Sequence, residues 1–234
     1  MIEINFFMRL PMARHTLLPA FGRVLNIASA GCPYRPRRPR LPQVRFGWYS
    51  KAMFTDMKHG TAADWAHIGA EHARHQQSMA ATQIMDGLRR LEAIEVGFGA
   101  NQLQHSLMAG TLARRAGASD EEVVAALTHD LGKLFSIPNH GPIAAEMLKP
   151  YVCDDIYHAI YWHQAFQGRY YFEHLGLDPE GRARFKDESW YAFAERLVDE
   201  WDAPAFDPGF DADPLESFEP EVIRVFSNPK KMVS

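Results

Sequence analysis

Cysteine is scarce in this chain of 234 residues, which contains only Cys32 and Cys153. Two cysteines so far apart exclude a disulfide framework and a thiolate zinc site. The chain also lacks an apolar run of the roughly 20 residues that a membrane-spanning helix needs. Alternating apolar and polar residues, which indicate half-buried strands, are absent as well, and so is any internal repeat. These absences favour an all-helical protein of the cytoplasm, where thiols stay reduced.

Acidic residues are almost missing from the N-terminal part. Residues 1–51 contain nine Lys and Arg but a single acid, Glu3, although the whole chain has 29 Asp and Glu against 25 Lys and Arg. The run PYRPRRPRLP at 33–42 cannot form a helix or a central strand. Such an arm is compatible with contact to nucleic acid or an anionic membrane, with targeting, and with sequence upstream of a natural start at Met53 or Met57. The favoured interpretation is a disordered or non-native extension.

From residue 61 onward, apolar periodicity predicts helices with short breaks. The predicted helices cover residues 61–94, 101–117, 119–131, 142–149, 154–163 and 190–201, with loops at 168–184 and 204–220. Two helix starts carry capping signals, one at Asn101 and one at Ser119, where Glu122 follows three residues later. Pro142 suits the first position of a helix, and Gly132 marks the end of one.

Histidine, in contrast, is abundant, with 11 residues. Six ordered residues lie on or at the ends of predicted helices, namely His105, His129, Asp130, His140, His163 and Asp202. The connections between these helices are short, so neighbouring helices can run antiparallel and bring the six side chains together. Imidazole and carboxylate ligands suit first-row metals such as Fe, Mn, Co or Zn. Five further histidines are interpreted as ordinary surface or core residues, namely His67, His72, His75, His158 and His174.

The adjacent pair His129 and Asp130 is the most informative part of this set. Neighbouring residues on a helix point in different directions. Both can therefore reach a metal only if the helix ends there, which Gly132 indicates. The two carboxylate oxygens of Asp130 can then bridge two metal ions.

This order of residues resembles the HD-domain superfamily of metal-dependent phosphohydrolases and oxygenases. Within it, the chain is most similar to the mixed-valent diiron oxygenases, namely myo-inositol oxygenase and the phosphonate-cleaving HD oxygenases. The similarity covers residues 60–226. It includes QLQH at 102–105, AGASD at 116–120, AALTHDLGK at 125–133, Trp201-Asp202, Asp207-Pro208, and PLESFEP at 214–220.

The resemblance implies an all-α HD-domain helical bundle with a dimetal site at its centre. Residues 56–234 would form this domain, and residues 1–55 the basic extension. The first iron would have four ligands, namely His105, His129, Asp130 and Asp202. The second would have three, namely Asp130, His140 and His163. Asp130 and Lys133 would be the catalytic residues, because Lys133 matches a substrate-contacting lysine of myo-inositol oxygenase.

Two departures from the relatives concern the substrate. Phosphonate-cleaving relatives carry a lysine four residues after the last histidine ligand, where this chain has Gln167, and the loop at 95–99 does not match theirs. These differences argue against a standard aminohydroxyphosphonate. An aromatic-rich stretch at 162–172 could line a pocket for a quaternary-ammonium substrate, or could simply pack between helices.

Three functions follow as alternatives. The first is an oxygenase that uses a mixed-valent Fe(II)/Fe(III) pair and O₂ to cleave a C–C or C–P bond of a small hydroxylated molecule, such as a hydroxyphosphonate or a polyol. The second is a phosphohydrolase, in which iron or other divalent metals activate water against a phosphoester or nucleotide. The third is a nucleic-acid-binding module, disfavoured because the body lacks interleaved basic and aromatic residues. The expected partners are a small-molecule substrate and O₂, with no membrane and no nucleic acid.

Overall fold

A computed structural model describes residues 54–227, 229 and 230 of the chain. The chain divides after Thr61 into two units. In the first unit, the described residues include the 3₁₀-helix η1 (Met57–His59), which Asp56 caps by accepting a hydrogen bond from the backbone N–H of Lys58. The expectation that residues 1–55 form a separate extension lies almost wholly outside the described residues and stays a prediction.

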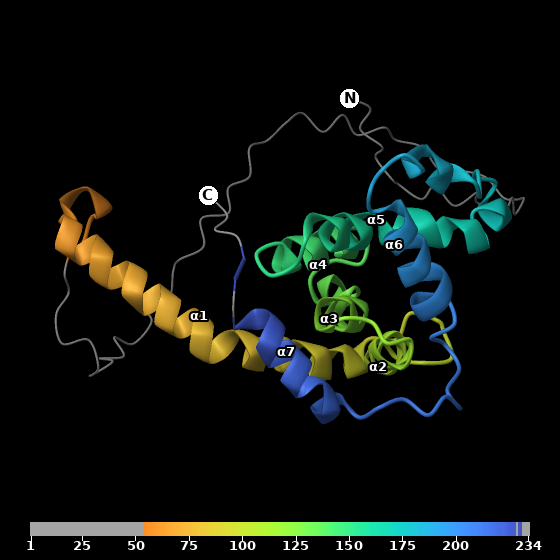
Figure 1. The fold of residues 1–234 in the computed structure, drawn as a ribbon, viewed down its shortest axis with the longest axis horizontal. Coiled ribbons are helices and arrows are strands. Elements are labelled where there is room, and N and C mark those ends of the chain that lie inside the picture. The colour runs from red at the N-terminus through yellow and green to blue at the C-terminus, as the bar shows by residue number, and fades with distance from the viewer. Residues whose placement is uncertain (1–53, 228, 231–234) are drawn as a thin grey trace, which may run out of the picture. The chain divides into compact units, whose positions relative to one another are not determined.

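The second unit is built from helices, and no strand occurs in the part of the chain that the structure describes (Figure 1). Its α-helices are α1 (Ala62–Arg90), α2 (Gln102–Arg115), α3 (Asp120–Thr128), α4 (His140–Leu148), α5 (Asp154–Tyr171), α6 (Tyr191–Arg196) and α7 (Glu219–Phe226). Shorter helices are η2 (Leu91–Ala93), η3 (Leu131–Leu134), η4 (Glu173–Leu175), η5 (Gly181–Phe185), the π-helix η6 (Leu197–Asp202) and η7 (Leu215–Phe218). The all-α prediction is confirmed. No described helix is long and apolar enough to cross a membrane.

The predicted cap at Asn101 and the predicted capping box at Ser119 are both present, and Asn101 forms a full capping box as well. The side chain of Asn101 accepts from the backbone N–H of Gln104 at the start of α2, and that of Ser119 accepts from Glu122 at the start of α3. In each case the side chain of the third helical residue accepts a hydrogen bond from the backbone N–H of the cap residue, so two otherwise unpaired donors are satisfied. The sequence therefore determines where these two helices begin.

Three boundaries differ from the predictions. Helix α4 begins at His140, two residues before Pro142, because its first turn needs no donor from the proline. Helix α5 continues to Tyr171, so the predicted loop at 168–184 is wrong at its start and also contains η4 and η5. The predicted loop at 204–220 contains η7 and the start of α7, where Pro220 sits in the first turn.

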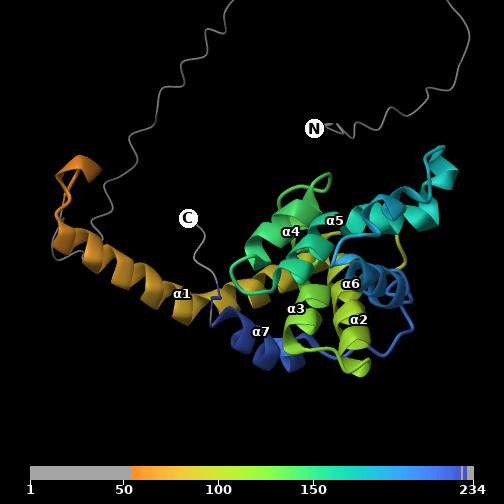
Figure 2. The ribbon, with the colours of Figure 1, turned by 45° about the horizontal axis from the view of Figure 1, so that its top comes forward.

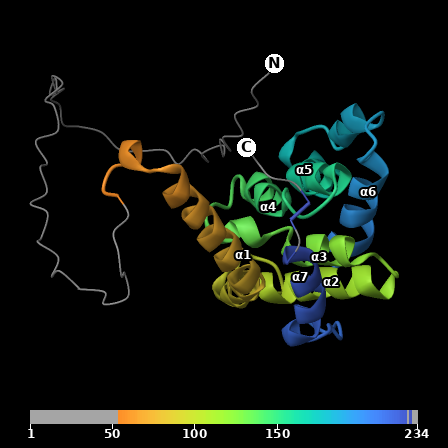
Figure 3. The same cartoon turned by 60° about the vertical axis from the view of Figure 1, so that its left-hand side comes forward.

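Helix α3 lies at the centre of the packing, in contact with α2, α5 and α7 (Figure 2). Its residues 123–128 are all buried, which fits a helix that is apolar around its whole circumference. Helices α4, α5 and α6 pack in sequence order on one side, and α7 packs against α3 and α1 (Figure 3). By contrast, the first 18 residues of α1 contain no buried residue, and this half of the helix projects from the other helices (Figures 1 and 2).

Arg114 and its neighbour Arg115 fasten the segment after Asp202 to α2, and Arg115 donates to the Asp211 carbonyl at 2.7 Å. The Arg114 guanidinium donates to Asp213 at 2.7 Å and to the Ser217 carbonyl at 3.0 Å, and it pairs with Glu221 at 2.9 Å. It also lies 3.8 Å from the ring centre of Phe218, a cation–π contact. These two side chains therefore join α2 to the segment that runs from η6 to α7.

We expect Arg114→Met to lower the free energy of unfolding by about 1–3 kcal/mol, because several charge-assisted hydrogen bonds are lost together. Urea unfolding followed by circular dichroism measures this loss. Arg74→Met is the matched control: Arg74 is exposed on α1 and pairs with Glu71 of the same helix, so its removal should cost much less than the removal of Arg114. Equal losses in the two variants would show that Arg114 does not fasten the segment.

Candidate metal centre

The C-terminal end of α3 delivers two of the predicted ligands. The helix ends at Thr128, and Asp130, with φ −99° and ψ 1°, has left helical geometry. The side chains of His129 and Asp130 are both fully buried. Because the helix ends here, two adjacent residues can point into one centre, as the sequence predicted.

Two glycines allow the other ligands to come close. A Cβ atom on Gly132 would lie 2.1 Å from the backbone oxygen of His140, a distance that no side chain tolerates. A Cβ atom on Gly141 would lie 3.0 Å from the ring of His163. The absence of a side chain at Gly132 therefore lets the turn after Asp130 pack directly on the start of α4.

Asp202 comes from a π-helical turn. Helix α6 widens into η6, which ends at Asp202, and both Trp201 and Asp202 are buried. Such widened turns place side chains where a regular helix would not, and they are frequent at functional sites. The last predicted ligand thus reaches the centre from a distorted helix end.

The backbone orients all four histidine rings in the same way. Each Nδ1 atom lies within hydrogen-bond distance of a carbonyl oxygen: His105 with Ala205 (2.9 Å), His129 with Ala126 (2.8 Å), His140 with Ile137 (2.7 Å) and His163 with Ile160 (2.7 Å). A carbonyl can only accept, so Nδ1 carries the proton in each ring. In the neutral rings, Nε2 is then left with a lone pair, the form in which histidine binds a metal.

These Nε2 atoms meet in two pairs. The Nε2 atoms of His105 and His129 are 3.1 Å apart, and so are those of His140 and His163. Two lone pairs that face each other at this distance repel unless a cation or a proton lies between them. The histidines therefore require two positive charges, one for each pair.

The two carboxylates complete both pairs. In Asp130, Oδ1 lies 2.9 Å from Nε2 of His140, whereas Oδ2 lies 3.4 Å from Nε2 of His105. In Asp202, Oδ1 lies 3.2 Å from Nε2 of His105. Oδ1 of Asp130 and Oδ1 of Asp202 are buried and have no hydrogen-bond partner. An unpaired buried carboxylate oxygen is costly, so both atoms indicate a missing cation.

The donor set fits two metal ions. Two groups of buried ligand atoms could each hold an ion, namely His105, His129 and Asp130, and Asp130, His140 and His163. With metal–ligand bonds of about 2.0–2.2 Å, neighbouring ligand atoms should be about 3–3.5 Å apart. The observed separations of 2.9–3.6 Å agree. Asp130 belongs to both groups, and Asp202 adds a fourth donor to the first.

The charges within the cluster are strongly coupled. Burial alone would lower the pKa of His129, but the Asp130 and Asp202 carboxylates outweigh burial and raise that pKa to about 9. Burial likewise opposes ionisation of the two carboxyl groups, yet the surrounding histidines hold the pKa values of Asp130 and Asp202 well below their usual range. Burial lowers the pKa of His163. Without metal, a proton on His129 thus supplies part of the missing positive charge.

Polar side chains surround the six predicted ligands. Lys133 donates to Oδ2 of Asp130 at 2.6 Å and to Oε1 of Gln102 at 2.8 Å, and Gln167 donates to Oδ2 of Asp202 at 2.7 Å. Gln102 is fully buried. No role was predicted for Gln102 from the sequence, although it stands three residues before the first ligand in the motif that carries the resemblance.

Three further residues lie around the centre, namely Ala205, Phe206 and Tyr171. The carbonyl of Ala205 orients His105, and the ring of Phe206 stacks on that histidine at 4.3 Å between ring centres. Tyr171 lies two turns beyond His163 on the same face of α5, and burial together with the Asp202 carboxylate raises the pKa of its hydroxyl. Tyr171 lies in the aromatic stretch at 162–172 that was noted in the sequence. No sequence pattern distinguishes Ala205 or Phe206, because long-range packing brings them to His105.

The remaining aromatic residues and histidines serve packing or lie on the surface. Phe166 is buried against Trp190, and Trp162 packs on Phe185, which also lies under the Arg184 guanidinium. A cation of the protein itself therefore occupies part of the stretch that could have bound a quaternary ammonium. Of the histidines interpreted as ordinary, His67, His72, His75 and His174 are exposed, and His158 stacks on Trp190.

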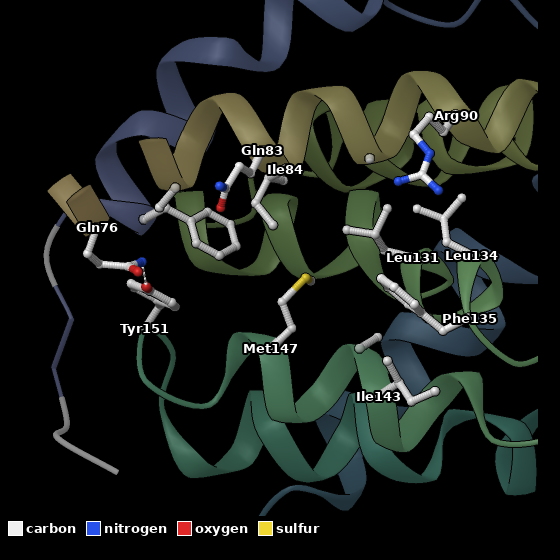
Figure 4. Close-up of a pocket in the computed structure, with 15 residues that line it drawn as sticks. Gln76, Gln83, Ile84, Arg90, Leu131, Leu134, Phe135, Ile143, Met147 and Tyr151 are labelled. Atoms are coloured by element: carbon white, nitrogen blue, oxygen red, sulfur yellow. Dashed lines mark hydrogen bonds between the residues drawn. The ribbon is translucent and has the colours of Figure 1, made fainter. Parts of the chain in front are cut away.

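A groove of about 330 Å³ lies between α1 and α4, with Leu131 and Phe135 of the turn after Asp130 along it (Figure 4). At one end Gln76 is hydrogen-bonded to the hydroxyl of Tyr151. None of the six predicted ligands lines this groove. It is therefore separate from the candidate metal centre.

A comparison with protein families finds a match to the HD domain over residues 103–203. All six predicted ligands lie within the matched stretch. A comparison with curated proteins gave no match. The family match and the helical fold support membership of the HD superfamily, and with it a metal-dependent enzyme whose buried His and Asp groups could hold divalent metal ions.

We expect Asp130→Ala to lose both metal ions, because Asp130 offers one oxygen to each histidine pair. Metal analysis of the purified variant gives the number of ions per chain. Asp86→Ala, which removes an exposed carboxylate paired with Arg89, should keep the wild-type content. Two ions retained by Asp130→Ala would contradict a bridging role.

We expect the metal-free protein to be most stable near pH 6.5. The raised pKa of His129 contributes stability that is complete below pH 6.5 and lost as the pH rises to about 9. The lowered pKa of His163 contributes stability that is lost as the pH falls below 6.5, and the lowered pKa values of Asp130 and Asp202 act likewise below about 3.8. Thermal unfolding in a chelator between pH 5 and 9 measures this profile. His129→Gln should flatten its alkaline side, and a wild-type melting temperature that is constant from pH 6.5 to 9 would refute the assignment.

Proposed function

We propose, on the premise of an HD domain at residues 103–203, that this chain is a dinuclear-iron oxygenase. In this proposal it uses O₂ to cleave a C–C or C–P bond of a small hydroxylated substrate. A mixed-valent Fe(II)/Fe(III) pair would be held by His105, His129, Asp130, His140, His163 and Asp202. When bound, the two ions would supply open coordination positions for O₂ and for a substrate hydroxyl, because four protein ligands serve one ion and three the other.

The observation that carries the proposal is the contact between the C-terminal segment and His105. Residues 201–220 contain the part of the sequence that resembles the diiron oxygenases most closely. The Ala205 carbonyl in this segment accepts from His105, and Phe206 covers the His105 ring and stacks in turn on Phe98 at 4.2 Å. The segment on which the resemblance depends is therefore part of the surroundings of a predicted ligand.

The residues around the cluster would bind and orient the substrate. The Lys133 side chain is about one-tenth exposed, and its ammonium group can reach an anionic or hydroxyl oxygen beside the metals. Gln167 holds one oxygen of Asp202 and so leaves the other directed at the first histidine pair. Phe206 and the buried helix ends keep bulk water away from the histidines.

A phosphohydrolase is the alternative, because the same six residues and Lys133 could serve a phosphoester. A lysine ammonium can bind a phosphate oxygen as well as the oxygen of a hydroxylated substrate, so Lys133 does not distinguish the two functions. The two functions differ in one requirement, since only the oxygenase consumes O₂.

We expect the iron-loaded protein, after partial reduction with ascorbate, to give the EPR signal of a mixed-valent diiron pair. It should also consume O₂ with at least one member of a panel of polyols, hydroxyphosphonates and quaternary-ammonium alcohols. Lys133→Ala should lower kcat/KM roughly tenfold to a hundredfold, the effect of losing one charge-assisted hydrogen bond of about 1.5–3 kcal/mol. Lys149→Ala, which removes an exposed lysine paired with Glu146, is the control and should not lower it.

The opposite outcome is equally specific. Release of phosphate from phosphoesters under strict anaerobiosis, with no O₂ uptake for any member of the panel, would refute the oxygenase and establish the hydrolase.

A further inference from the structure

The two carboxylates of the centre share one feature. In each, the protein holds one oxygen and leaves the other without a partner. Oδ2 of Asp130 accepts from Lys133 at 2.6 Å, and Oδ2 of Asp202 accepts from Gln167 at 2.7 Å. Oδ1 of each has no hydrogen-bond partner. The unpartnered oxygens lie one beside each histidine pair, so each pair has one carboxylate oxygen free to bind a metal.

The Asp130 oxygen that accepts from Lys133, Oδ2, is also placed to bind a metal ion. Oδ2 of Asp130 lies 3.4 Å from Nε2 of His105 and 3.5 Å from Nε2 of His129. It is therefore the atom through which Asp130 would bind the first metal ion and so bridge the two. An ammonium group and a metal ion of higher charge compete for this one oxygen.

Lys133 also has a second hydrogen-bond acceptor that would remain if a metal ion displaced it from Asp130. Its ammonium group donates to Oε1 of Gln102 at 2.8 Å. Gln102 is fully buried in the first turn of α2, three residues before His105. A buried ammonium that lost Asp130 would therefore keep one acceptor in the protein.

We propose that Lys133 is a latch on the bridging oxygen of Asp130. Without metal, its ammonium group supplies positive charge beside the first histidine pair. Metal binding at His105 and His129 displaces the ammonium group from Asp130, and Gln102 retains it at the edge of the centre, where it is free to meet a substrate. This inference rests on the dinuclear centre of the proposed function but not on which reaction that centre performs.

If Lys133 is such a latch, its removal should increase the affinity for metal, whereas removal of a residue beside a metal ligand usually decreases it. A residue that merely orients a metal ligand strengthens metal binding, and its removal typically weakens affinity tenfold to a hundredfold. A residue that competes with the metal weakens binding, so its removal should strengthen affinity. Lys133→Met keeps a long unbranched side chain without the charge, and it separates the two roles by the direction of the change.

The test is titration of the metal-free full chain with Mn²⁺, followed by calorimetry and by EPR, which reports coupling between two bridged Mn²⁺ ions. We expect Lys133→Met to bind Mn²⁺ about tenfold more tightly than wild type and to show the coupled signal at a lower Mn²⁺ concentration. Lys149→Met is the control, since Lys149 pairs with Glu146 on the surface, and its affinity should equal that of wild type.

Gln102→Leu provides a second, independent test. Without Oε1 of Gln102 the displaced ammonium has lost an acceptor, so this variant should bind Mn²⁺ more weakly than wild type. The weakening should disappear when Gln102→Leu is combined with Lys133→Met, whereas damage to the fold would persist in the double variant.

The outcomes separate the two proposals. If wild type binds two Mn²⁺ ions and Lys133→Met binds them with equal or lower affinity, the latch is wrong and the dinuclear centre stands. If wild type binds fewer than two ions, the dinuclear centre of the proposed function fails, and the latch fails with it.

Discussion

Four imidazole rings turn their Nε2 lone pairs toward one another at the centre of this fold, in pairs 3.1 Å apart. Backbone carbonyls hold every ring through Nδ1, so no ring can turn away without leaving a buried hydrogen bond unmade. Water is excluded, and the repulsion can be relieved only by cations. Metal binding would therefore convert an unfavourable cluster into the most strongly bonded part of the protein, and metal affinity and folding stability are linked through it.

The arrangement of helices follows from this constraint. The C-terminal two-thirds of α3, residues 123–128, is buried, and its end can therefore present His129 and Asp130 to an interior that water does not reach. Gly132 then brings the following turn within contact of His140, which a larger residue would prevent. The π-helical turn that ends at Asp202 closes the centre from the opposite end of the sequence. Local irregularities, rather than regular helices, place these ligands.

The sequence predicted those parts of the protein that depend on local chemistry. The caps at Asn101 and Ser119 follow from hydrogen bonds between near neighbours. Gly132 was predicted to end the helix, but α3 already ends at Thr128 and Gly132 lies within η3. The ordered histidines and aspartates could be identified because their residue types restrict the possible partners. Gln102 and Phe206 could not be assigned in this way, because a buried amide and a stacked ring depend on tertiary packing: Gln102 accepts from Lys133, 31 residues away, and Phe206 stacks on His105, about 100 residues away. Helix α7 was not predicted, because the Asp- and Pro-rich stretch before it has the composition of a loop.

The charge balance around the centre bears on the kind of substrate it would accept. Gln167 donates a hydrogen bond to Asp202 and adds no positive charge, at a position where the phosphonate-cleaving oxygenases that the sequence resembles carry a lysine. The ammonium of Lys133 is already paired with Asp130, so it becomes available to a substrate only after metal has taken its place. Within the proposed oxygenase, a doubly charged phosphonate would thus meet less positive charge from the protein than a lysine at position 167 would supply. A neutral polyol needs only hydrogen bonds and a metal-bound hydroxyl, and an amide at position 167 can supply the former while the two ions supply the latter.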